Sequence, residues 1–250
     1  MSTRFSRLIV QEPPCRTSRR TADLHQTSSE VCPHFLKQVA RILTLLCVSL
    51  TLGAARDVNR DNKALLRATS PFEDLVEFGL TKNEAAISKS LTEADRRAAV
   101  IREVIGSSAS GKFDELLAAL HQATTDRDHS KLAMSAVEAF RLLIDNLKPQ
   151  GLQVPKEVSL LDYAGFKLQV LGAAPRPDWG AIRQVIGDAE GWWLTTKASV
   201  SDKALRDAFN STLRGLQDAG KLENLPMLQF AARIDLDLVD LLERYFSRKR

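Results

Sequence analysis

Cysteine is missing from most of this chain. Its three cysteines, Cys15, Cys32 and Cys47, all lie in the first 47 of 250 residues. The sequence after Cys47 therefore offers no disulfide framework, no thiolate zinc site and no cysteine nucleophile. It also lacks the Cys-x-x-Cys-His motif through which haem is attached covalently.

Recognisable catalytic motifs are equally scarce. The sequence contains no Gly-x-Ser-x-Gly turn, His-Glu-x-x-His pair, P-loop or dinucleotide-binding glycine pattern. Histidine is rare as well, and the two histidines beyond residue 34, His121 and His129, do not have the spacing of metal ligands. We therefore expect a non-enzymatic protein, and the sequence predicts no cofactor.

An excess of positive charge is absent once the first 55 residues are set aside. The whole chain has 35 Lys and Arg against 31 Asp and Glu, and residues 1–55 hold seven of the former and three of the latter. The remaining 195 residues therefore carry 28 charges of each sign. Nucleic-acid binding depends mainly on clustered Lys and Arg that neutralise phosphates, so we expect no nucleic-acid partner.

One long uncharged run stands near the start of the chain. Lys37 and Arg41 precede fourteen uncharged residues, 42–55, which end in Gly53, Ala54 and Ala55. A basic region, an apolar region and a small-residue cleavage site form a secretory signal, so residues 1–55 are interpreted as an export leader with a basic extension. A membrane anchor is the alternative, but a span needs about 20 apolar residues. The predicted location is periplasmic or secreted, with no membrane span after cleavage.

Apolar residues after the leader recur at helical spacing. Phe113, Leu116, Leu117 and Leu120 share one face, and no stretch alternates long enough to predict a sheet. The sequence predicts an all-α fold, an antiparallel helical bundle over residues 71–250, preceded by a flexible or short helical lead-in at 56–70. We expect helix starts at Ser70–Pro71, Thr92 and Ser201–Asp202, and a flexible loop at 106–111.

Short matching segments indicate an internal repeat. Residues 101–106 read IREVIG and residues 182–187 read IRQVIG, while LLDYAG at 160–165 matches MLQFAA at 227–232. Two tandem helical units of about 75 residues, near 93–172 and 178–246, would explain these matches. Resemblance by composition is the alternative, because any amphipathic helix constrains its apolar positions.

Three tryptophans cluster at the beginning of the second predicted unit. Trp192 and Trp193 are adjacent, so their side chains diverge by about 100° on a helix and cannot both point inward. One ring is expected to be covered by the first unit, by a partner protein or by a ligand. Trp179, Trp192 and Trp193 are therefore the candidate binding residues.

Carboxylates beside the apolar stripes provide a second candidate site. An ionised carboxylate that faces a core is costly unless it is paired or binds a metal. The metal interpretation would bring together five side chains from separate helices: Glu84, Glu138, Glu190, Asp235 and His121. In the alternative interpretation the carboxylates form ordinary ion pairs, such as Glu138 with Arg141, and Asp235 lies at the edge of its stripe in water.

Two functional hypotheses follow. The first is an exported, non-enzymatic helical protein that binds a partner protein or small ligand at the seam between its units. The alternative is a periplasmic protein with a divalent metal in that carboxylate site. The sequence leaves the ligand, the partner and the oligomeric state open.

Overall fold

The computed structural model describes residues 58–248, and the all-α prediction is confirmed there. Every regular element in this range is helical, and none is a strand. Among these residues, no helix combines the length and the apolar character needed to cross a bilayer. The predicted leader, including the apolar run 42–55, lies outside the described residues.

The helices follow one another with short connections. A first helical segment covers residues 58–81. It is followed by α2 (Glu84–Ile105), α3 (Ser107–Asp126), α4 (His129–Asp145), α5 (Lys156–Gly172), α6 (Trp179–Thr196), a short 3-10 helix (Lys197–Ser199), α7 (Lys203–Leu222) and α8 (Leu225–Arg248).

Side-chain caps explain where several helices begin. The carboxylates of Asp128, Asp178 and Asp202 each accept a hydrogen bond from the backbone N–H three residues later. Such a cap satisfies one of the amides that a helix start leaves unpaired. The predicted start at Ser201–Asp202 is confirmed, with Asp202 as the capping residue of α7.

The predicted start at Ser70–Pro71 is wrong, because the helix continues through both residues from 58 to 81. Proline inside a helix leaves the carbonyl four residues earlier without its usual donor. Here that carbonyl belongs to Arg67, and the guanidinium of Arg97 on α2 donates a hydrogen bond to it. A tertiary contact therefore satisfies the group that Pro71 frees.

Two further boundary predictions are also wrong. Thr92 does not start a helix, since it lies inside α2 and its hydroxyl donates to the Ser88 carbonyl at 2.9 Å. The predicted loop 106–111 is reduced to Gly106, and α3 begins at Ser107. The left-handed φ of 73° at Gly106 reverses the chain in one residue, which glycine allows at little cost.

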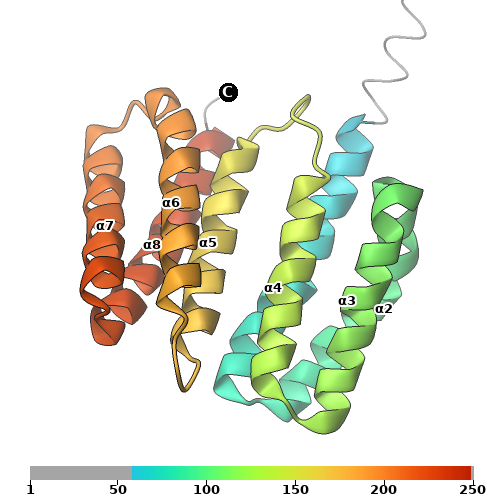
Figure 1. The fold of residues 1–250 in the computed structure, drawn as a ribbon. Coiled ribbons are helices and arrows are strands. Elements are labelled where there is room, and N and C mark those ends of the chain that lie inside the picture. The colour runs from blue at the N-terminus through green and yellow to red at the C-terminus, as the bar shows by residue number, and fades with distance from the viewer. Residues whose placement is uncertain (1–57, 249–250) are drawn as a thin grey trace, which may run out of the picture. The chain divides into compact units, whose positions relative to one another are not determined.

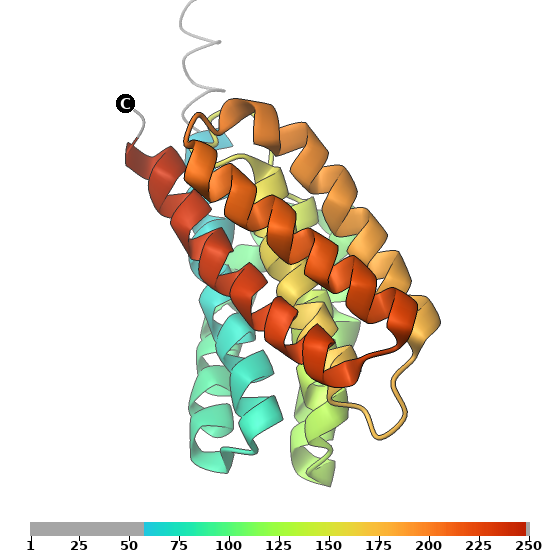
Figure 2. The same ribbon diagram turned by 90° about the vertical axis from the view of Figure 1, so that its left-hand side faces the viewer.

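The apolar side chains form two cores that share α5. The first core is built by the helix 58–81, α2, α3 and α4, with Leu160, Tyr163 and Val170 of α5. The second core is built by α5, α6, α7 and α8. Figure 1 shows the two groups of helices side by side, and Figure 2 shows that α7 and α8 run obliquely to the helices of the first core. We call the boundary between the two cores the seam.

These cores do not coincide with the predicted tandem units. The first predicted unit, 93–172, includes α5, yet most of the fully buried α5 side chains belong to the second core. The matched segments also differ in place: 101–106 ends α2 at the Gly106 turn, while 182–187 lies inside α6, where Gly187 is exposed. The internal repeat stays a prediction.

Candidate functional site

The five residues of the metal hypothesis lie in separate surroundings. His129 Nε2 is 3.3 Å from Glu84 Oε1, and His121 Nε2 is 2.9 Å from Asp95 Oδ1. Glu138 pairs with Lys167 across α4 and α5. Within residues 58–248, no group of three or more His, Cys, Asp and Glu side chains is arranged to hold a metal ion. The structure therefore does not bring the predicted ligand set together.

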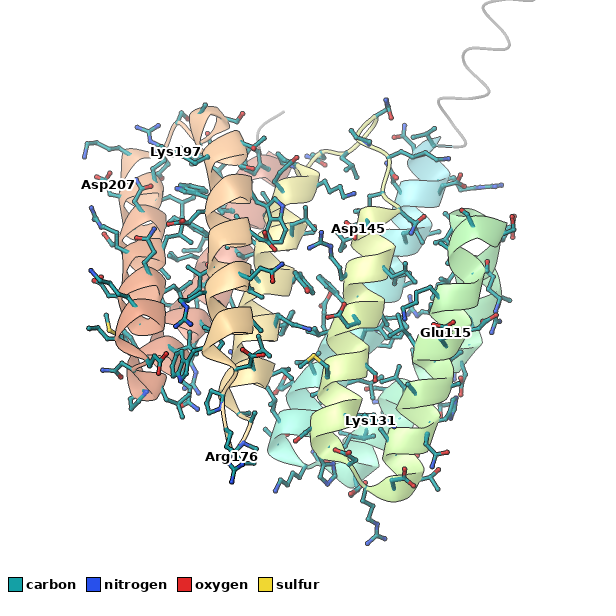
Figure 3. All side chains as sticks on the ribbon, viewed as in Figure 1. Glu115, Lys131, Asp145, Arg176, Lys197 and Asp207 are labelled. Carbon is teal, nitrogen blue, oxygen red and sulfur yellow. The ribbon has the colours of Figure 1, made fainter. Side chains whose placement is uncertain are left out.

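Glu190 instead lines a pocket between α6 and α7. The pocket has a volume of about 730 Å³ and also includes Trp193, Lys197, Asp207 and Arg214. Figure 3 labels Lys197 and Asp207 at the same end of this helix pair. Both signs of charge line the pocket, so Glu190 shares its surroundings with cationic side chains rather than with other predicted ligands.

The three tryptophans have different roles. Trp193 is 2% exposed in the second core, stacks on Phe209 at a centroid distance of 4.4 Å, and donates a hydrogen bond from Nε1 to Asn210 Oδ1 at 2.8 Å. Trp179 is half-buried against the second core. Trp192 packs against both cores. Among the three candidates, Trp192 is the residue that the structure places at the seam.

On the side of the seam around Trp192, the charges are balanced. The guanidinium carbon of Arg141 lies 4.9 Å from the ring centroid of Tyr163 and 5.0 Å from that of Trp192, within cation–π range. Lys167 donates a hydrogen bond to Glu138 a short way along α5. Burial and the negative charge of Glu138 raise the pKa of Tyr163 to about 12. We call Glu138, Arg141, Tyr163, Lys167 and Trp192 the balanced stripe.

Asp235 on α8 has no such compensation. It is fully buried, and neither carboxyl oxygen has a hydrogen-bond partner among residues 58–248. The close approach of α5 explains the burial: a Cβ added to Gly165 would lie 2.5 Å from a methyl carbon of Leu236 and 3.1 Å from Asp235 Oδ2. Removal from water raises the pKa of Asp235 to about 8. Asp235 therefore lies in the core beside the apolar stripe, and not at the edge of that stripe in water.

A pocket of about 390 Å³ opens at the seam, between the helix 58–81, α4, α5 and α8. We call it the seam pocket. Four carboxylates line it, from three helical segments: Glu73, Asp162, Asp240 and Glu243. Its apolar lining includes Leu66, Phe140, Ile144, Leu147, Leu152 and Val154, and its hydroxyl groups come from Thr69, Ser70, Ser159 and Ser247.

The carboxylates of the seam pocket repel one another. Burial raises the pKa of Asp162 well above its usual value, and the charges of Glu73, Glu243, Asp235 and Asp240 raise it further. Burial also raises the pKa of Glu73 and of Glu243. No Lys, Arg or His lines the pocket. Asp240 has a distant surface partner, since its Oδ2 lies 3.9 Å from Arg244 Nη2.

Sequence reasoning identified Asp235 but missed the four carboxylates of the seam pocket. Asp240 and Glu243 lie three residues apart on α8, and this spacing places them on one face. Nothing in the sequence pairs that face with Glu73, which lies more than 160 residues earlier. The spacing within α8 was therefore a usable signal for the pair Asp240 and Glu243. The sequence held no signal for the helix that packs beside them.

A second surface feature is an apolar groove between α7 and α8. Phe230 is 69% exposed and Leu241 is 45% exposed, and each lies beside a pocket between these two helices. The larger pocket, which Leu241 and Tyr245 line, has a volume of about 690 Å³. Nothing in the structure indicates which molecule would cover this groove.

Comparisons with known proteins do not indicate a function for this chain. No model of a protein family, no curated protein and no solved structure matches this chain. The seam pocket and the residues around it are therefore the basis of the proposed function.

Proposed function

We propose that this chain is an exported, non-enzymatic binding protein that holds a positively charged ligand in the seam pocket. The observation that carries the proposal is the set of four carboxylates, from three helical segments, lining a pocket that has no cationic side chain in its lining. The export part of the proposal depends on the predicted leader in residues 1–55.

The chemistry of the lining favours binding of a cation. Buried carboxylates are normally paired with cations or hydrogen-bond donors, because an isolated buried charge costs several kcal/mol. Burial raises the pKa of Asp162, and the neighbouring charges that raise it further all belong to carboxylates: Glu73, Glu243, Asp235 and Asp240. A bound cation would supply the missing opposite charge and convert this repulsion into attraction.

The size of the pocket suits a small ligand. Small-molecule sites usually have volumes of about 300–1,000 Å³, with mostly apolar walls and a few polar groups that orient the ligand. The seam pocket, at about 390 Å³, lies in that range and has six apolar side chains beside its carboxylates. Its position between two cores also resembles the usual placement of ligand sites between packed units.

Thermal melting tests this proposal directly. A cation that binds only the folded state should raise the melting temperature in proportion to its affinity, because it stabilises that state by mass action. The expected result is a concentration-dependent increase with at least one cation at constant ionic strength, and its loss in Glu243→Gln.

The matched control is Glu115→Gln, which removes an exposed carboxylate on α3, labelled in Figure 3. This variant should respond to cations like the parent protein. An equal response in Glu243→Gln, or no response to any cation, would contradict the proposal.

A mass spectrum of the protein purified from its host tests the export part separately. The predicted mature chain starts at Arg56, after Gly53, Ala54 and Ala55. Recovery of the intact 250-residue chain from the cytosol would remove the leader interpretation without affecting the binding result.

A further inference from the structure

We infer that the ligand of the seam pocket is a linear aliphatic polyamine, whose ammonium groups pair with the separate carboxylates while its methylene chain packs on the apolar wall. This inference rests on the proposed function and specifies its ligand class. The juxtaposition that supports it is a set of four carboxylates from three helical segments around one pocket, together with an apolar wall from α4 and the connection that follows it.

The distribution of negative charge favours a ligand with several separated positive groups. Glu73 comes from the helix 58–81, Asp162 from α5, and Asp240 and Glu243 from α8, so the carboxylates surround the pocket. Within residues 58–248, no three acidic side chains converge closely enough to hold one metal ion. A single small cation would therefore leave part of this charge unpaired.

The uncharged part of the lining favours methylene groups. α4 contributes Phe140 and Ile144 to the pocket, and Leu147, Leu152 and Val154 come from the connection between α4 and α5. An alkyl chain gains about 25 cal/mol for each Å² of apolar surface removed from water. A hydrated divalent ion would gain nothing from such a wall.

Quaternary ammonium ligands fit this pocket less well. Such groups are usually recognised by several aromatic faces around the cation. Phe140 is the only aromatic residue in the lining, and its ring makes an edge contact with Phe166 at a centroid distance of 5.9 Å. Primary and secondary ammonium groups, which donate hydrogen bonds to carboxylates, match the lining better.

Asp162 supplies a second, independent observation that points to a ligand. Asp162 is half-buried at the seam, and it lines the pocket. No hydrogen bond or ion pair to this side chain occurs among the described residues. Behind it, the fully buried Asp235 carboxyl adds a further negative group without a partner. Buried carboxyl groups of this kind need protons or an external donor.

Ligand binding should therefore release protons. Several titratable groups lie around Asp162. The acidic ones are Glu73 and Asp74 on the helix 58–81, and Asp235, Asp240 and Glu243 on α8. Arg244 lies at the outer edge, beside Asp240. Burial and mutual repulsion raise the pKa of Glu73, Asp162 and Glu243, so these groups retain protons to higher pH than usual. A polyamine favours their ionised forms, and its affinity should increase as the pH rises.

Isothermal titration calorimetry on the protein spanning residues 56–250 tests the inference with three probes at equal ionic strength: spermidine, Mg²⁺ and a hexalysine peptide. Spermidine should bind with release of protons, seen as a binding enthalpy that depends on the ionisation enthalpy of the buffer. Mg²⁺ should bind much more weakly. Spermidine affinity should fall about tenfold or more in Glu243→Gln, because one charge-assisted hydrogen bond is lost.

Two further variants test whether a loss of affinity comes from the pocket carboxylate itself, and not from damage to the fold or from a general loss of negative charge. Asp162→Asn keeps the shape of the side chain and removes one repelling charge, so it should fold at least as stably as the parent while it loses spermidine affinity and part of the proton release. Glu115→Gln should leave the affinity unchanged. A loss of affinity that is equal in all three variants would overturn the inference.

The outcomes separate this inference from the proposed function. If Mg²⁺ or hexalysine binds through Glu243 and spermidine does not, the polyamine assignment is wrong while a cation site at the seam stands. If none of the probes binds at neutral or at mildly alkaline pH, both proposals fail.

Discussion

Two neighbouring stripes of α5 differ in the charges around them. On one stripe, Tyr163 contacts Arg141, and Lys167 pairs with Glu138. On the other stripe, Asp162 lies near Glu73 and Glu243. The two stripes are about 100° apart on the same helix, and both face the first core. The balanced stripe pairs each sign of charge with its opposite. The seam pocket gathers one sign only.

The contrast shows what the fold itself requires of the seam. Contacts such as Phe140 with Phe166 and Lys167 with Glu138 already join α4 to α5. The carboxylates of the seam pocket add repulsion to this joint rather than strength. Groups that destabilise a structure in this way are often kept for binding or catalysis, and this supports a functional role for the unbalanced side.

The largest expected effect comes from removing the ring of Phe140, which contacts α5 and also lines the seam pocket. Phe140 is 2% exposed, packs against Phe166 and lines the seam pocket. Phe140→Ala should lower the free energy of unfolding by about 4 kcal/mol, because a large buried ring leaves a cavity. Urea unfolding measures this loss. Phe230→Ala, at an exposed ring, should change stability by less than about 0.5 kcal/mol, and equal losses would contradict the assignment of Phe140 to the core.

Asp235 should make stability depend on pH. Its pKa is about 8 in the folded state, against 3.8 for the free group. The folded state therefore holds the proton more tightly, so the stability is fully present below about pH 4 and falls as the pH rises towards about 8. Asp235→Asn should remove much of this slope and should be more stable than the parent above pH 8, by several kcal/mol.

Denaturant unfolding of both proteins at several pH values checks this prediction. Other carboxylates at the seam contribute in the same direction, so Asp162→Asn serves as the comparison variant. If Asp235→Asn and the parent have parallel stability profiles across this range, Asp235 is not the buried carboxyl that the structure describes.

Removing one charge of the balanced stripe should lower the free energy of unfolding by a moderate amount. The Lys167 side chain is 15% exposed, and its removal would leave Glu138, which is 37% exposed, without its cation. Lys167→Met keeps most of the aliphatic chain and should lower the free energy of unfolding by about 1 kcal/mol, because the exposed carboxylate is partly screened by water. The double variant Lys167→Met, Glu138→Gln should recover part of the loss, and a thermodynamic cycle over the four proteins measures the coupling.

The smallest expected effect has the opposite sign. Asp162→Asn removes one of the repelling charges, so it should raise the free energy of unfolding by less than about 1 kcal/mol at neutral pH without ligand. Adding spermidine should reverse the order, since the parent protein gains more from the ligand. A destabilised Asp162→Asn variant would show that Asp162 makes a stabilising contact.

Local sequence rules predicted the helices well but placed some of their ends incorrectly. Apolar spacing predicted the helical faces of Phe113 and Leu120, and the Asp202 cap marked the start of α7. Pro71 was misleading because the donor that rescues its helix, Arg97, comes from α2, 26 residues later. A rule that considers only neighbouring residues cannot include such a donor.

The candidate site divides in the same way. The apolar neighbours of Asp235 were enough to place this carboxylate beside an apolar stripe, because three- and four-residue spacing defines a helix face. They did not decide between the core and the edge of the stripe in water. The same rule could not show that Glu84 would lie beside His129 or that Glu138 would pair with Lys167. Each pairing depends on which helix packs against which face.

The sequence by itself determined that the described chain is helical, which stripes are apolar and that Asp235 lies beside one of them, because these properties follow from spacing along one helix. Only the tertiary structure decided that α5 belongs to two cores, that Gly165 lets α8 approach closely, and that Glu73 shares a pocket with Asp162, Asp240 and Glu243. The physical reason is that helix packing is set by the fit of whole surfaces. Residues distant in the chain acquire a common electrostatic environment only after that fit is made.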